Sequence, residues 1–210
     1  MNSKQKVIFI FRSIILVGAL WGLWLQLFPN QWHQLTYYTL QSNIVVAIFL
    51  IYLLYRMIKD GEDAFNNHHL LRLKGGVTIA ITLTFMVYSI LLAPIADPKD
   101  FYNMKNYLLH YFVPIAMILD WLLFDKCKVY KKVDPILWTI LPLIYTIFSL
   151  IKGYIFRIPI PDQKHSPYPY FFINIDKLGW NGFLVYFVAI LIGYMIIGYG
   201  MYWIKQIKRK

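Results

Sequence analysis

The chain has 210 residues, of which 59% are hydrophobic and only 15% are charged, and its formal net charge is +11. This composition is far more apolar than that of a soluble domain, and it therefore excludes a soluble protein. The positive charge does not indicate nucleic-acid binding, because the basic residues are spread over the segments between the apolar stretches and do not form one patch.

Six apolar stretches each approach the roughly 20 residues that cross a hydrocarbon core of about 30 Å. They predict an all-α polytopic membrane protein, a six-helix bundle that forms a single transmembrane domain over residues 1–210. The six predicted helices cover about residues 7–28, 35–57, 75–92, 107–124, 135–154 and 183–204.

Most of the 21 basic residues lie in the termini and in alternate loops, and we count Arg12, Lys74 and Lys205 among them. Such a bias predicts that both termini are cytoplasmic. We therefore expect a multi-pass protein of the plasma (cytoplasmic) membrane.

The second predicted helix contains an unusual polar stripe within LTYYTLQSNIVVAIFL, residues 35–50. Thr36, Thr39 and Asn43 are spaced i, i+3 and i+7, which places them on one face of a helix. A helix in lipid satisfies its own backbone and does not need polar side chains. The stripe is therefore a candidate site.

The loop at residues 59–74 contains His68 and His69 close to two acidic residues. Their spacing does not match the ligand spacing of a known metal site, so we predict a solvated loop and no metal.

The fourth predicted helix contains His110, and Asp120 follows ten residues later. Because the second and fourth helices both run inward from the outer surface, Thr36 and His110 fall at a similar depth. A hydroxyl becomes a good nucleophile when a nearby base takes its proton, and imidazole is the usual base. We predict Thr36 and His110 as a catalytic pair, with Thr39 nearly as good by position. Asp120 lies about 15 Å further along the helix, which is too far to orient His110.

The longest predicted outer segment, residues 153–181, contains four prolines and many aromatic residues. We expect it to form an ordered cap over the outer mouth of the bundle and to exclude water from a site there. Asn43 or a tyrosine from this cap is a candidate to polarise a substrate carbonyl or to orient the base. The predicted substrate-binding residues are Thr39, Asn43, Tyr107, Lys152 and Tyr168.

Other interpretations stay open at this point. A single intramembrane His can simply bridge helices, and a Thr stripe can simply permit close packing, although ionisable residues in membrane helices are functional by default. The rival function is lipid binding or transport without covalent catalysis, yet the internal repeat that transporters usually carry is not evident. A third possibility is a structural membrane protein that recruits a partner through its basic loops.

Several strings resemble the androgen-induced-gene family of integral membrane hydrolases. That family has a Leu-Thr-aromatic motif at the start of its second helix, a His followed by a Val/Leu-Pro pair and an acid, and a Tyr-Pro-aromatic stretch followed by a Gly before the last helix. The corresponding residues here are Leu35-Thr36-Tyr37, His110, Val113-Pro114, Asp120, Tyr168-Pro169-Tyr170 and Gly179.

The resemblance implies a distant, bacterial relative that hydrolyses fatty acid esters, such as fatty acid esters of hydroxy fatty acids. It assigns the threonine nucleophile to Thr36 and the base to His110. We expect no cofactor and no metal, a lipid ester and membrane lipids as partners, and no nucleic acid. The stretch after Tyr37 is more polar than in animal members, which leaves the natural substrate open, and the sequence does not determine the oligomeric state.

Overall fold

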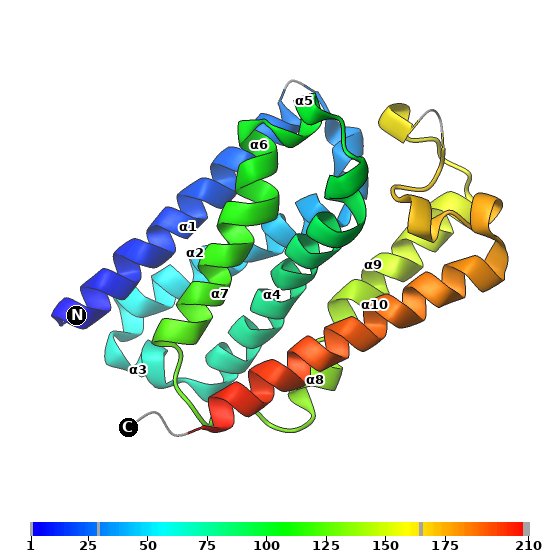
Figure 1. Cartoon of the computed structure of the whole chain (residues 1–210). Helices are drawn as coiled ribbons and strands as arrows, with labels where there is room; N and C mark the ends of the chain where they lie inside the picture. The colour runs from blue at the N-terminus through cyan, green and yellow to red at the C-terminus, as the bar shows by residue number, and fades with distance from the viewer. Residues whose placement is uncertain (1, 29, 164–165, 208–210) are drawn as a thin grey trace.

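The computed structural model describes residues 2–28, 30–163 and 166–207, and no strand occurs in these ranges. Figure 1 shows the arrangement of the helices. The long α-helices are α1 (Ser3–Leu27), α2 (Tyr38–Asp60), α4 (His68–Val87), α7 (Val113–Phe124), α9 (Ile140–Leu150) and α10 (Ile175–Gln206). The short ones are α3 (Glu62–Asn66), α5 (Pro98–Phe101), α6 (Met104–Tyr107) and α8 (Asp134–Leu137).

Shorter 3₁₀ and π turns extend or connect these helices. The 3₁₀ turns are η1 (Trp32–Thr36), η3 (Ala93–Ile95), η6 (Pro161–Gln163) and η7 (Phe171–Ile173). The π turns are η2 (Tyr88–Leu92), η4 (Leu108–Phe112) and η5 (Ile151–Ile155). η2 continues α4, η4 precedes α7, and η5 continues α9. Such π turns are frequent at functional sites.

Six helical segments in the described part of the chain are long and apolar enough to cross a membrane. They are Ser3–Leu27, Tyr38–Asp60, His68–Ile95, Met104–Phe124, Asp134–Ile155 and Ile175–Gln206. Large apolar side chains such as Val17 and Ile196 are more than 60% exposed on their outer faces, as a lipid-facing surface requires. The prediction of an all-α polytopic membrane bundle is confirmed.

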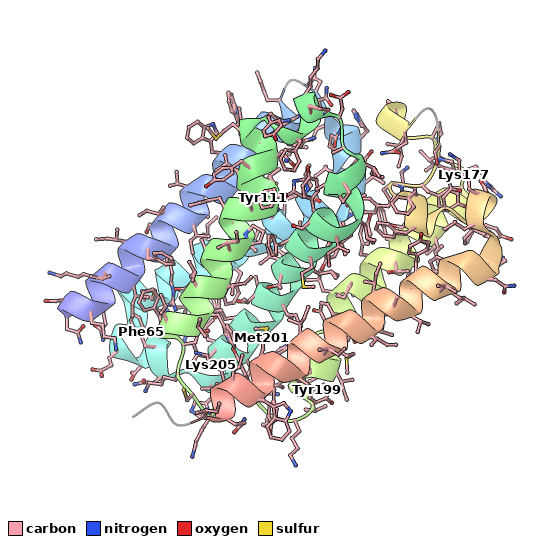
Figure 2. The ribbon with its side chains drawn as sticks, in the orientation of Figure 1. Phe65, Tyr111, Lys177, Tyr199, Met201 and Lys205 are labelled. Carbon is pink, nitrogen blue, oxygen red and sulfur yellow. The ribbon has the colours of Figure 1, made fainter. Side chains whose placement is uncertain are left out.

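Four of the long helices form a closed group in which α1 packs on α2, α2 on α4, α4 on α7 and α7 on α1. The helices α9 and α10 lie beside this group, and α10 packs on α8, α4 and η7 (Figure 1). α1 begins and α10 ends at the same end of the bundle, which we call the terminal end. Figure 2 places Lys205 at this end and Lys177 at the opposite one, the cap end.

Two spans begin earlier than the apolar runs predict, because asparagine side chains cap them. Asn67 accepts from the Leu70 N–H and starts α4 at His68 rather than near residue 75. Asn174 accepts from the Lys177 N–H and starts α10 at Ile175 rather than near residue 183. The left-handed conformation of Gly179 (φ +65°) kinks this early part of α10, a conformation that glycine adopts readily.

A buried ionic cluster joins α1, α4 and α7 near the terminal end. Arg12 Nε lies 3.0 Å from Asp120 Oδ1, and Lys74 pairs with both Asp120 and Asp125. No more than 2% of any of these four side chains is exposed. The placement of Arg12 and Lys74 in solvated termini and loops is therefore wrong, because carboxylates compensate their charges inside the bundle.

Lys205 is also buried, near the end of α10. Its Nζ donates to the backbone oxygens of Leu122 at 3.3 Å and Asp125 at 2.8 Å. It also lies 5.0 Å from the centre of the Trp121 ring, a cation–π contact. Lys205 therefore attaches α10 to the end of α7, and its assignment to a terminus outside the helices is wrong, because it lies buried in the last turn of α10.

Candidate active site

Thr39 and His110 form a side-chain pair between α2 and η4. Thr39 Oγ1 lies 3.1 Å from His110 Nε2, and His110 Nδ1 lies 3.3 Å from the backbone oxygen of Asn106. A carbonyl oxygen only accepts hydrogen bonds, so Nδ1 carries the ring proton. Nε2 then presents its lone pair to the Thr39 hydroxyl, which donates to it. This is the arrangement of a nucleophile and its base.

The turn that carries His110 is shaped by a proline four residues later. In a π turn the N–H of a residue bonds the carbonyl five residues earlier, as Val113 bonds Leu108. Pro114 has no N–H, so it cannot bond the Leu109 carbonyl in this way. The Asn43 amide of α2 supplies the donor instead, at 3.1 Å from the Leu109 oxygen.

Asn43 also donates to the backbone oxygen of Thr39 at 2.8 Å, and its side chain is fully buried. One amide therefore ties the backbone of the threonine to the backbone next to the histidine. Asn43 positions the pair and is not itself in contact with the His110 ring nitrogens.

Tyr88 fixes the plane of the imidazole. The rings of Tyr88 and His110 are stacked, with centroids 3.8 Å apart and planes inclined by 23°. Tyr88 belongs to the π turn η2, so two of the three π turns meet at this site.

The prediction that Thr36 faces His110 is corrected, because Thr39 occupies that position. Thr36 ends the 3₁₀ turn η1, and Tyr37 is extended (ψ 139°) before α2 begins at Tyr38. The helix is thus broken between Thr36 and Thr39, and the i, i+3 stripe does not extend across the break. The Thr36 backbone oxygen instead accepts from the Tyr145 hydroxyl at 3.1 Å.

Three of the predicted substrate-binding residues lie away from the pair. Tyr107 is 56% exposed, and Lys152 donates to the backbone oxygen of Ile158 at 2.9 Å. The Tyr168 hydroxyl donates to Asp176 at 3.3 Å, within the cap. The other two, Thr39 and Asn43, lie at the site described above.

Two cavities meet at Thr39. The first, which we call the vestibule, has a volume of about 740 Å³ and lies at the cap end. The second, which we call the crevice, is narrow and apolar and runs between α4, α9 and α10. Four side chains line both of them and form their junction: Thr39, Tyr88, Leu92 and Tyr170. The polar lining of the vestibule includes Gln26, Gln31, Gln34, Asn106, His110 and Gln163.

Tyr170 brings the cap to this junction. Its phenol lies close enough to the Thr39 side chain and to the N–H groups of Tyr38 and Thr39 for these groups to lower its pKa. The N–H groups in the first turn of a helix have no acceptor within the helix, so they can donate hydrogen bonds to an oxygen outside it. Burial raises the pKa of Tyr170 to about 12, although the neighbouring Thr39 opposes the rise. The phenol therefore stays protonated at neutral pH.

In the described part of the chain, no group of three or more His, Cys, Asp or Glu side chains could hold a metal ion. His68 and His69 lie in the first turn of α4.

Comparison of the chain with protein-family models, curated proteins and solved structures gave no match. The fold and the site define a polytopic all-α membrane protein with a threonine–histidine pair between a polar and an apolar cavity.

Proposed function

We propose that the protein is an intramembrane hydrolase of lipid esters in which Thr39 is the nucleophile and His110 is the general base. The observation that carries the proposal is the 3.1 Å contact from Thr39 Oγ1 to His110 Nε2, with Nδ1 held by the Asn106 carbonyl. Such a carbonyl fixes the tautomer that a base needs, as a carboxylate does in other triads.

In the first half of the reaction, Thr39 Oγ1 attacks the ester carbonyl carbon and its proton passes to His110 Nε2. The C–O bond to the alcohol then breaks, and the leaving oxygen takes that proton from Nε2. An acyl-Thr39 ester remains. In the second half, His110 takes a proton from water, the hydroxide adds to the acyl carbon, and the proton returns to Thr39 as the fatty acid leaves.

The negative charge that develops on the carbonyl oxygen needs donors at the same place. The Tyr170 phenol lines the same two cavities as Thr39, and it is close enough to the N–H groups of Tyr38 and Thr39 for them to lower its pKa. A substrate oxygen that takes the position of the phenol oxygen would face both N–H groups, with the phenol displaced to donate from the side. Donors that are fixed in advance stabilise such an oxyanion strongly in a site that excludes water.

The two cavities suit the two parts of a lipid ester. The polar part of the substrate would lie in the vestibule and the apolar part in the crevice, so that the ester bond lies at Thr39. A lipid-binding or transport protein could use the same cavities without covalent catalysis, and an activity assay separates the two functions.

We further propose that the protein resides in the plasma membrane.

The test is turnover by the purified protein in detergent. Long-chain fatty acid esters are supplied with and without EDTA, and the released fatty acid is quantified. We expect turnover that EDTA does not reduce, because the described residues that form the site need no metal for the reaction above. Folded protein that hydrolyses none of the esters would contradict the proposal and favour lipid binding.

Replacing Tyr170 by Phe is expected to lower kcat by about 10²-fold, the typical effect of removing one oxyanion donor. KM should change little, because the ring and its packing are kept. The matched control is Tyr168→Phe, which removes a cap hydroxyl that bonds Asp176 instead and should leave kcat close to that of the wild type. Equal kcat values for the two variants would exclude a catalytic role for Tyr170.

A further inference from the structure

We propose that the crevice binds the acyl chain of the ester and that Tyr194 sets the longest chain that the protein accepts. This inference rests on the proposed function, since it takes Thr39 at the mouth of the crevice as the point where the ester bond is held. It adds a substrate property, chain length, and the residues that determine it.

The crevice follows one face of α10. Phe183, Phe187 and Tyr194 line it at spacings of four and seven residues, which keep them on a single helical stripe. At 1.5 Å per residue, the 11 residues from Phe183 to Tyr194 correspond to about 16 Å of depth along the helix axis. This depth is comparable to the length of an extended acyl chain, and because the volume of the crevice is about 80 Å³, its side chains must move apart to admit one.

The other two walls reach a similar depth. α4 and α9 both run from the terminal end toward the cap end, whereas α10 runs the opposite way (Figure 1). Leu83 of α4 and Leu143 of α9 are therefore among the deepest lining residues of those helices, as Tyr194 is of α10.

Tyr194 forms a fixed floor. Its side chain is only 2% exposed, and its hydroxyl donates to the backbone oxygen of Trp138 at 2.8 Å. A ring that is held by packing and by a hydrogen bond at its tip cannot easily swing aside for a longer chain. A chain that exceeds the available depth would have to displace it.

The polar groups along the crevice are already satisfied by the protein, so the interior favours an apolar occupant. The Thr146 hydroxyl donates to the Pro142 oxygen at 2.9 Å, and the Thr84 hydroxyl lies 2.7 Å from that of Ser42. The Tyr38 and Tyr145 hydroxyls donate to the backbone oxygens of Ala80 and Thr36, both at 3.1 Å. A ligand with acceptor groups at this depth would find these hydroxyl protons already bonded, whereas a hydrocarbon chain needs no polar partner.

The test uses alkyl fluorophosphonates whose alkyl chain increases in length from one probe to the next. The rate of adduct formation is measured by intact mass for the wild type, Tyr194→Leu and Leu143→Trp. We expect the wild-type rate to rise with chain length and then to fall sharply at a cutoff. Tyr194→Leu should move the cutoff to longer chains, and Leu143→Trp, which fills the deep end, should move it to shorter ones.

The matched control is Tyr202→Leu, which removes another buried tyrosine of α10 that does not line the crevice, and it should leave the cutoff unchanged. Because Leu143→Trp adds volume where Tyr194→Leu removes it, either variant alone tests the proposal if the other does not fold. Adducts with an unmoved cutoff in the folded variants would overturn the chain-length proposal and leave the hydrolase intact. No adduct with any probe would overturn both.

Discussion

Replacing Thr39 by Ala is expected to lower kcat/KM for ester hydrolysis by about 10⁴-fold or more, the usual scale for loss of a nucleophile. The hydroxyl that His110 activates is absent in this variant, and water must then react without a covalent intermediate. Released fatty acid is measured over a range of ester concentrations. Thr36→Ala is the control, because it keeps the backbone oxygen that accepts from the Tyr145 hydroxyl, and it should retain near wild-type turnover.

His110→Gln should lower kcat/KM to a similar extent. Glutamine can still hydrogen-bond with the Thr39 hydroxyl, but it cannot take up the proton. Residues that act as a unit show non-additive losses, so the double variant Thr39→Ala/His110→Gln should be no slower than either single variant. Losses that simply multiply would show that the two residues act independently, contrary to the proposed mechanism.

The second large effect concerns stability. Asp120→Asn is expected to lower the free energy of unfolding by about 3–5 kcal/mol, because it leaves two buried cations with a single carboxylate, that of Asp125, between them. Arg12 and Lys74 both pair with Asp120, and all three side chains are almost completely buried. An asparagine could keep some hydrogen bonds but would not balance the two positive charges.

The matched control for Asp120→Asn is Asp60→Asn, which removes a carboxylate from the partly exposed i,i+4 pair with Arg56. Solvent screens such a pair, so the change in stability should be far smaller. Unfolding is followed by circular dichroism as SDS replaces a mild detergent. Similar losses in the two variants would show that the buried cluster does not stabilise the bundle more than a surface pair does.

The membrane spans could be predicted because apolar runs of sufficient length have few alternatives to a membrane helix. The ends of the helices could not be predicted in the same way. The first turns of α4 contain His68, Arg72 and Lys74, which hydropathy assigns to a loop. Capping by Asn67 and the contacts of Lys74 with Asp120 and Asp125 decide where this helix begins.

The site was partly predictable. Thr39, Asn43 and His110 stood out as polar residues in apolar helices, and the structure brings all three together. Thr36 did not follow the pattern, because the extended Tyr37 interrupts the helix that the spacing assumed. The role of Asn106 was accessible in principle, since it precedes His110 by four residues and its carbonyl lies on the same helical face.

The ionic cluster could not be predicted from the sequence. Arg12 and Asp120 are 108 residues apart, and Arg12 and Asp125 are 113 apart. The sequence pattern places Arg12 with the basic terminus and Asp120 within the fourth helix, and only the packing of α1 against α7 brings them together. The contact of Tyr170 with Thr39 could not be predicted from the sequence either, because it depends on how the cap folds back over the bundle.

Intact-mass analysis after treatment with a fluorophosphonate is the most direct test of Thr39 as the nucleophile. The purified wild type, Thr39→Ala and Thr36→Ala are treated in parallel. We expect a single adduct on the wild type and on Thr36→Ala, and none on folded Thr39→Ala. An adduct that persists in Thr39→Ala and disappears in Thr36→Ala would contradict the assignment of the nucleophile.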